Sequence, residues 1–282
     1  MDPAAAIAGF LDDVERRTGR EPLSEAKRRR LRGAPSDTVL ITDDEGLAAI
    51  AVSVPYAQGD GSTHWEVETV VRSDMAFAAF ESMVVKQAIP SVPRGAPASI
   101  WSSRPSLTTA LTDLGLKRIR RLLHMVVPLP VTLEYRSSVI RAYRAEDIGA
   151  ILDIHRAAFE GHREVASLDR EGFEEIARSP WFDDAGIVVA TDDGTVTGFC
   201  WTKVHPNGDG EIYRIAVDPG HHGEGFGRSL LGAGLDLLSG RSDVTRGTLW
   251  VDDANVKAVE LYESVGMVTE AENLEFELIE RP

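Results

Sequence analysis

The order of helices and strands predicted for the first half of the chain recurs in the second half, and this repeat constrains the fold more than any other feature. Alternating or β-branched runs between glycine, proline and aspartate clusters predict strands, and helical spacing of apolar residues predicts the helices between them. The first half is expected to contain helices near 4–17 and 24–32, strands near 38–42, 47–54 and 64–71, a helix at 74–88, the strand "ASIWS", the helix "SLTTALTDLG" and a strand through "RRLLHMVVPL". The second half is expected to contain helices near 146–159 and 169–178, strands near 186–191, 195–204 and 211–217, a helix at 225–238, a strand at 247–252, a helix at 255–265 and a strand at 272–279.

The two halves also end alike, with "LTTALTDLGLKRIR" in the first and "AVELYESVGMVTEA" in the second, which indicates a tandem duplication. A length of 282 residues suits two domains of about 100–200 residues each. Pro128 and Pro130 open a linker before "VTLEYRSS". We therefore predict an α/β protein with domains at 1–130 and 139–282, each a mixed central sheet flanked by helices.

A glycine-rich stretch, "DPGHHGEGFGRSLL" at residues 218–231, lies between a predicted strand and a predicted helix. The strand is "GEIYRIAV", and Phe226, Leu230, Leu231, Leu235 and Leu238 give the helix one apolar face. Consecutive backbone N–H groups at a helix N-terminus attract anions, and glycine lets a ligand approach closely. The stretch is expected to bind a phosphate or pyrophosphate.

Two other interpretations of the stretch are weaker. A metal site at His221 and His222 is disfavoured because adjacent side chains in a turn rarely converge and no third ligand is evident. If the stretch is a turn with only a structural role, its glycines still need an explanation, because each costs a helix about 1 kcal/mol relative to alanine where it lies inside one. These glycines are Gly225, Gly227, Gly232 and Gly234. The spacing matches neither the Walker pattern nor the Rossmann pattern.

Charge and composition limit the partners. The formal net charge of −15 argues against nucleic acid, and "KRRRLR" at 27–32 is interpreted as an exposed helix face. No apolar run approaches the roughly 18 residues of a membrane span, and the N-terminal segment carries early acids instead of a basic leader. Cys200 is the single cysteine, so no intrachain disulfide forms. A cytoplasmic monomer that binds neither membrane nor nucleic acid is expected.

The segment from His222 to Gly227 resembles the Gln/Arg-x-x-Gly-x-Gly/Ala loop of the GNAT acetyltransferase superfamily, with His222 in place of Gln or Arg. "IAVDP" and "LWVDDANVKAVELYESVGM" resemble strands and a helix of the same superfamily. The resemblance implies that acetyl-CoA is the acetyl donor and that no metal takes part. Its implied binding residues are Ile215, Ala216, Val217, His222, Gly223, Glu224, Gly225, Phe226, Gly227, Arg228, Asn255 and Lys257.

A narrower resemblance is to the mycothiol synthase family of tandem GNAT enzymes, carried by "AAFEGH", "PWFDDAG", "GFCWTKVHP" and "GEIYRIAVDP". It implies acetylation of the cysteinyl amine of Cys-glucosaminyl-inositol, the last step of mycothiol biosynthesis. Three departures stand against it: "GHREVASL" replaces a family stretch, Trp250 replaces a tyrosine, and "VETVVRSDMAFAAFESMV" lacks the glycines of a first cofactor loop. We expect that the first domain does not bind acetyl-CoA through such a loop and is structural.

The family resemblance also suggests residue roles. Amine acetylation needs a base, and Glu211 at the start of its strand is the candidate. Tyr262 is the candidate acid for the departing thiolate, although core packing competes as its role, and Cys200 is interpreted as a packed strand residue. Substrate contacts are expected from Glu25, Glu164, Lys203 and Trp250. Two alternatives remain open: acetylation of another small primary amine, and a non-catalytic acyl-CoA sensor.

Overall fold

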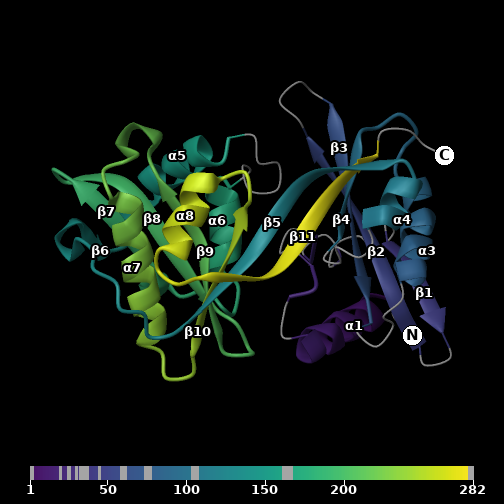
Figure 1. Cartoon of the computed structure of the whole chain (residues 1–282), viewed down its shortest axis with the longest axis horizontal. Helices are drawn as coiled ribbons and strands as arrows, with labels where there is room; N and C mark the ends of the chain where they lie inside the picture. Colours follow the sequence, from purple (N-terminus) through teal and green to yellow (C-terminus); the bar gives the residue numbers. More distant parts are fainter. Residues whose placement is uncertain are drawn as a thin grey trace. The chain divides into compact units, whose positions relative to one another are not determined.

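The computed structural model describes residues 3–18, 21–23, 27–28, 31, 38–43, 46–57, 62–72, 78–102, 108–160 and 168–278. The chain forms two compact units, which are Met1–Leu122 together with Ala271–Pro282, and Leu123–Glu270 (Figure 1). These units are not the contiguous halves 1–130 and 139–282 expected from the sequence, because the end of the chain belongs to the first unit. Strands β5 (Leu116–Pro128) and β11 (Val268–Leu278) each begin in one unit and end in the other.

The first unit is a mixed sheet with strand order β1-β2-β3-β4-β11. Only β3 and β4 pair in parallel within this order. Side chains alternate along β2, so Ile50 and Val52 pack with α1 on one face while Ala49 and Ala51 pack with α3 on the other. The elements are α1 (Pro3–Thr18), β1 (Thr38–Asp43), β2 (Gly46–Ala57), β3 (Thr63–Val71), α3 (Ala78–Ala88), β4 (Ala98–Ser102) and α4 (Thr108–Asp113).

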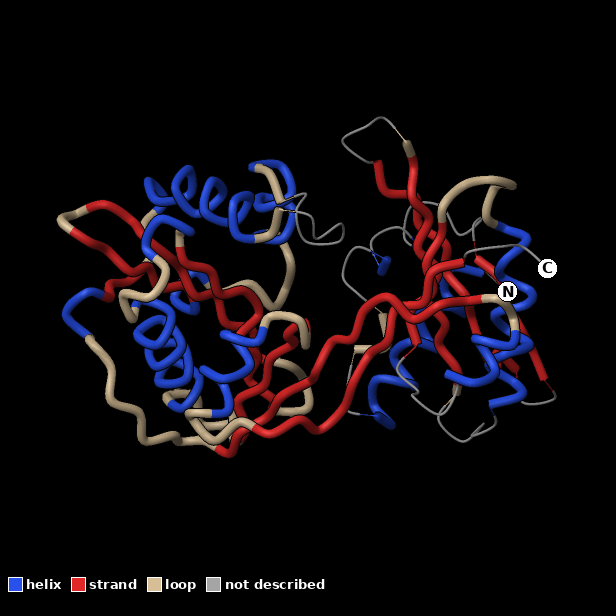
Figure 2. The backbone as a smooth tube through the Cα atoms, turned by 45° about the horizontal axis from the view of Figure 1, so that its top comes forward, coloured by secondary structure: helices blue, strands red, loops and turns tan. Residues whose placement is uncertain are grey.

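The second unit is a mixed sheet with strand order β5-β10-β9-β8-β7-β6 (Figure 1), and Figure 2 distinguishes its strands from its helices by colour. Helices cover both faces: α7 and α8 pack on one face, and α5 and α6 pack on the other. The elements are β6 (Ile140–Ala142), α5 (Ile148–Ala158), α6 (Arg170–Ala177), β7 (Ile187–Asp192), β8 (Thr195–Val204), β9 (Asp209–Val217), α7 (Phe226–Ser239), β10 (Arg246–Asp252) and α8 (Val256–Glu263).

The element order predicted from the sequence is confirmed wherever the structure describes it. Gly115 ends α4 as expected, with φ +81° and its N–H donating to the Thr112 carbonyl at 2.9 Å. The expected caps Asp74 and Ser106 lie outside the described residues, as does most of the helix expected near 24–32. The sequence missed β6, a strand of three residues that is too short to show a period. Within the described ranges, no helix has the length and apolar character needed to cross a membrane.

Candidate active site

The two parallel strands β9 and β10 pair over only three positions and then separate. The pairs are Asp209–Arg246, Gly210–Gly247 and Glu211–Thr248. Strand β9 then continues to Val217, and β10 continues to Asp252, without pairing to each other. Beyond Glu211, the edge of β9 that faces β10 therefore does not pair with β10. An extended ligand can pair with such an edge as an added strand.

The glycine-rich stretch lies directly after this unpaired part of β9. Gly223 and Gly225 both have φ +84°, in the left-handed region that glycine adopts at low cost. Gly225 is the N-cap of α7, and its residue type supplies no capping side chain. The first N–H groups of a helix have no intrahelical partner, so this 14-residue helix presents donors and its positive dipole end at the loop.

Neighbouring side chains hold the loop in shape. The ring Nε2 of His222 lies 3.1 Å from the Val217 carbonyl, which ties the loop back to the end of β9. The Arg136 guanidinium donates to the Glu224 carbonyl and lies 5.0 Å above the Phe226 ring. Phe226 is buried, so any contact it makes with a ligand is through its backbone. Arg136 is a cation beside the loop that sequence reasoning missed, because it lies in the linker, 88 residues before Glu224, and has no local signal.

Two of the three glycines inside α7, Gly232 and Gly234, have a different role from the loop glycines. A methyl group on Gly234 would lie 2.5 Å from the Cys200 sulfur, and one on Gly232 would lie 2.4 Å from the Tyr135 ring. These glycines let the helix approach its neighbours closely. Their helical cost is explained by packing, so it does not count as support for a ligand loop.

Glu211 occupies the last paired position of β9, where the two strands begin to separate. Its side chain is 15% exposed, and its Oε2 lies 2.8 Å from His205 Nε2. Burial opposes ionisation of this carboxyl, but the His205 hydrogen bond and the charges of His205, Lys203 and His124 together lower its pKa. Glu211 is therefore a carboxylate at neutral pH.

The face of the sheet that carries Glu211 also carries Lys203 and Trp250. Lys203 is the cross-strand partner of Glu211, and its side chain is only 3% exposed, with its ammonium 4.5 Å above the Trp181 ring. Trp250 is two residues beyond the partner of Glu211 on β10, is 41% exposed, and packs against the His124 ring with the centroids 4.8 Å apart and the planes tilted by 38°. The structure thus brings these predicted residues to one face, with Lys203 deeper than the sequence suggested.

Tyr262 lies on the opposite face, in the apolar cluster that packs α7 and α8 on the sheet. Burial, with a smaller contribution from Cys200, raises the pKa of the Tyr262 phenol, which stays protonated. Burial likewise raises the pKa of Cys200 to about 12, so this thiol is a packed core group and not a nucleophile at neutral pH. Glu211 and Tyr262 do not touch, since they approach the sheet from its two faces.

Asn255 and Lys257 are at the start of α8, which follows β10. The Asn255 Oδ1 accepts a hydrogen bond from the Ala258 N–H at 3.3 Å, so this side chain is the N-cap of the helix. Lys257 is exposed in the first turn. An N-cap can also face a ligand, and the geometry leaves both residues at the edge of the sheet where β10 ends.

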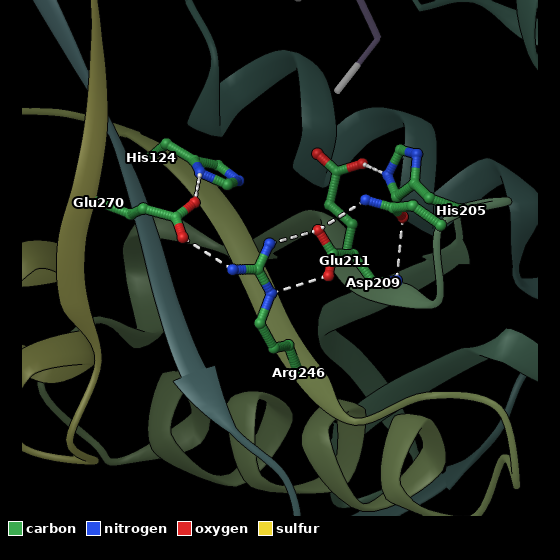
Figure 3. A network of polar contacts seen from close by, with 7 residues as sticks. His124, His205, Asp209, Glu211, Arg246 and Glu270 are labelled. Carbon is green, nitrogen blue, oxygen red and sulfur yellow. Dashed lines mark hydrogen bonds and ion pairs between the residues drawn. The ribbon is translucent and has the colours of Figure 1, made fainter. Parts of the chain in front are cut away.

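A network of charged side chains holds the base of the site together (Figure 3). Arg246 donates to both carboxylate oxygens of Asp209, at 2.8 and 2.7 Å, and to Glu270 at 2.7 Å. His124 lies 3.4 Å from the other Glu270 oxygen. Because Asp209 and Arg246 are the first pair of the β9–β10 ladder, this clamp keeps the two strands together on one side of Glu211.

The first unit has a parallel ladder with an acid at its last pair too, and that acid is engaged differently. Glu68 pairs with Trp101 at the end of the β3–β4 ladder. It lies 3.1 Å from the ammonium of Lys27, which is 3% exposed and also 3.3 Å from Glu66, so Lys27 is a buried ion-pair partner and not part of the exposed helix face expected for residues 27–32. The two substrate contacts expected from Glu25 and Glu164 lie outside the described residues.

The paired histidines do not converge on a common point. His222 faces the Val217 carbonyl, whereas His221 Nδ1 lies 3.4 Å from Glu224. Ligand atoms of Asp192, His221 and Glu224 all lie within 4.8 Å of one another, so a third candidate ligand comes from the β7–β8 turn. Asp192 and Glu224 are exposed, and exposed acidic groups of this kind are common without an ion.

The fold and the sequence comparisons place the chain in a known class. Residues 148–267 match the family model of the Acetyltransferase (GNAT) family. A GCN5-related N-acetyltransferase from Sphaerobacter thermophilus superposes with a TM-score of 0.69 at 20% identity, covering 97% of this chain and 91% of that one. A tandem GNAT protein from the clavulanic acid biosynthesis pathway superposes with a TM-score of 0.63 at 14% identity, covering 98% and 95%. The fold is that of a tandem GNAT acetyltransferase, as the sequence predicted.

Sequence identity to individual relatives is higher than identity to these solved structures. A mycothiol acetyltransferase of Acidimicrobium ferrooxidans is 32% identical over 292 residues, covering 95% of this chain and 91% of the relative. A mycothiol acetyltransferase of Thermomonospora curvata is 32% identical over 269 residues, covering 92% and 88%. The chain belongs to the mycothiol acetyltransferase family, and it is an acetyltransferase.

Proposed function

We propose that the chain transfers the acetyl group of acetyl-CoA to the cysteinyl amine of Cys-glucosaminyl-inositol, the last step of mycothiol biosynthesis. The observation that carries this proposal is the separation of β9 and β10 directly after Glu211. A carboxylate stands at the closed end of this opening, and the glycine-rich loop and α7 N-terminus follow the open part of β9.

The donor is held along β9 and at the loop. The pantetheine arm pairs with the backbone from Ile215 to Val217 as an added strand, and a backbone N–H there polarises the thioester carbonyl. The pyrophosphate binds the N–H groups between His222 and Arg228, where the helix dipole and the Arg136 guanidinium favour negative charge. GNAT acetyltransferases use acetyl-CoA as donor, and the conformation of this loop supports the same use here.

The transfer needs proton movements at both ends of the reacting bonds. The substrate ammonium gives a proton to Glu211, directly or through water, and the free amine attacks the thioester carbon. As the C–N bond forms and the C–S bond breaks, the leaving thiolate takes a proton from Tyr262, and the second proton lost by the amine nitrogen returns through water to the Tyr262 phenolate. At neutral pH Glu211 is ionised and can accept a proton, and Tyr262 is protonated and can donate one, whereas the directions of the two pKa shifts make Glu211 a weaker base and Tyr262 a weaker acid than the free side chains.

The acceptor lies on the Glu211 face of the sheet. Trp250 offers an exposed ring for stacking, and Lys203 places a positive charge beside Glu211. The family resemblance also assigns Glu25 and Glu164 to contacts with the sugar and inositol. Family membership supports this acceptor, and it also favours an enzyme over an acyl-CoA sensor. Acetylation of another small primary amine is the second candidate, favoured by the altered stretch "GHREVASL".

Mass spectrometry of reaction mixtures tests the proposal. Purified protein is incubated with acetyl-CoA and Cys-glucosaminyl-inositol, and parallel mixtures contain other primary amines. We expect selective N-acetylation of the named acceptor. The rate of this reaction should fall by about 10²–10⁴-fold in Glu211→Gln. Glu174→Gln, an exposed acid on α6, is the matched control and retains wild-type turnover. Preferential acetylation of a different amine would refute the named acceptor, and full turnover in Glu211→Gln would remove that residue from the mechanism.

A further inference from the structure

His205 is the side chain that holds the carboxylate of Glu211. Its Nε2 lies 2.8 Å from Glu211 Oε2, and both side chains are mostly buried, at 17% and 15% exposed. Figure 3 shows that this contact uses one carboxylate oxygen while the other points away from the imidazole. The pair lies next to the position where β9 and β10 separate. A contact that fixes the orientation of the Glu211 carboxylate therefore fixes it relative to the opening between these strands.

The fold fixes His205 through the turn between β8 and β9. The last pair of the two strands is Val204–Gly210, and His205 is the next residue. Its backbone N–H donates to the Asp209 carbonyl at 2.8 Å, and its carbonyl accepts from the Gly208 N–H at 3.0 Å. Gly208 has φ +85°, which closes the turn at low cost.

The far side of the turn is also anchored. Arg246 holds the Asp209 carboxylate with two hydrogen bonds, and Asn207 Nδ2 contacts the same carboxylate at 3.0 Å. The imidazole is therefore delivered from a backbone that is hydrogen-bonded at both ends. A side chain held in this way limits the rotation of the group that it contacts.

We infer that His205 is the positioning residue of the catalytic carboxylate: its Nε2–H donates to Oε2 of Glu211 and leaves Oε1 directed at the acceptor amine. This inference rests on the proposed role of Glu211. The imidazole does not touch the acceptor and exchanges no proton with it. Its contribution is to hold the carboxylate in one rotamer and in its ionised form, so that the acceptor amine meets a base that is already oriented.

Three variants separate positioning from a structural role. His205→Leu removes the donor, His205→Gln keeps an N–H donor without a titratable ring, and Asn207→Ala alters the same turn without touching Glu211. We expect His205→Leu to lower kcat by about 10- to 100-fold with little change in the KM for acetyl-CoA. His205→Gln should recover most of the loss, and Asn207→Ala, which loosens the turn but leaves the imidazole in place, should lose less than His205→Leu. Equal losses in His205→Leu and Asn207→Ala, or no loss in His205→Leu, would overturn the inference.

A second measurement does not depend on turnover. The Glu211 carboxyl is titrated by ¹³C NMR in the wild type and in His205→Leu, with Lys203 and His124 unchanged as the other charged groups that act on it. Loss of the donor should raise the Glu211 pKa, and His205→Gln should restore it. An unchanged Glu211 pKa would refute the hydrogen bond. If the pKa shifts as expected but Glu211→Gln retains turnover, the contact is real and the proposed function of Glu211 is wrong.

Discussion

Gly234→Ala tests the close packing of α7 on the sheet. An added methyl would lie 2.5 Å from the sulfur of Cys200 and 2.8 Å from Cδ1 of Ile212. Cys200 is fully buried and Ile212 is 4% exposed, so neither atom has free space to move into. The helix must shift away from β8 and β9 to accept the methyl, which disturbs the packing beneath the β9–β10 opening.

The size of the effect follows from two opposing contributions. Overpacking a core by one methyl costs about 1–3 kcal/mol, whereas alanine gains up to about 1 kcal/mol over glycine inside a helix. Gly149→Ala in α5 is the matched control, because its methyl would have nothing within 4 Å. The Gly149→Ala control therefore gains only the stability that alanine adds over glycine inside a helix. The two variants should differ by about 1–3 kcal/mol, with Gly234→Ala the less stable.

Thermal unfolding followed by circular dichroism measures the difference. A loss of 1–3 kcal/mol corresponds to a Tm lower by about 2–10 °C for a unit of this size. Cys200→Ala removes the closer of the two clashing atoms, so the cost of Gly234→Ala should be smaller in that background than in the wild type. A Gly234→Ala protein as stable as Gly149→Ala would refute the packing argument.

Three other outcomes follow from the described contacts. In the native protein at pH 8, Cys200 should not react with an aromatic disulfide reagent, because burial raises its pKa to about 12, and it should react fully after unfolding; rapid native labelling would contradict its burial. Asn255→Ala should lower the unfolding free energy by about 1 kcal/mol through loss of the α8 cap, while Asn255→Asp keeps an acceptor and most of that stability. Asp209→Asn should destabilise the protein by about 1–3 kcal/mol at pH 7. Although burial opposes ionisation of Asp209, hydrogen bonds from Arg246 and Asn207 lower its pKa. The stabilisation is therefore complete above the unfolded pKa of about 3.9 and is lost as the pH falls through the lower folded value. Denaturant unfolding should show the gap between Asp209→Asn and the wild type closing below about pH 4, and a gap that widens there would refute this assignment.

Local patterns in the sequence determined the order of the elements and the position of the glycine-rich loop. Apolar spacing and glycine chemistry act over a few residues, so they can be read without a partner strand. The same patterns predicted Asn255 at the start of a helix and Cys200 inside a strand. Motif resemblance supplied the acetyltransferase class, which the comparisons confirm.

Only the tertiary structure decided how distant segments meet. Strand pairing returns the end of the chain to the first unit through β11 and β4, an arrangement that no local period encodes. Pairing register also sets Lys203 opposite Glu211, and the turn between their strands brings His205 onto the same carboxylate. Arg136 reaches the loop from the linker in the same way. These contacts depend on which strands and turns pack together. The residues that form them have side chains that are equally suited to an exposed surface, so their residue types alone do not reveal the contacts.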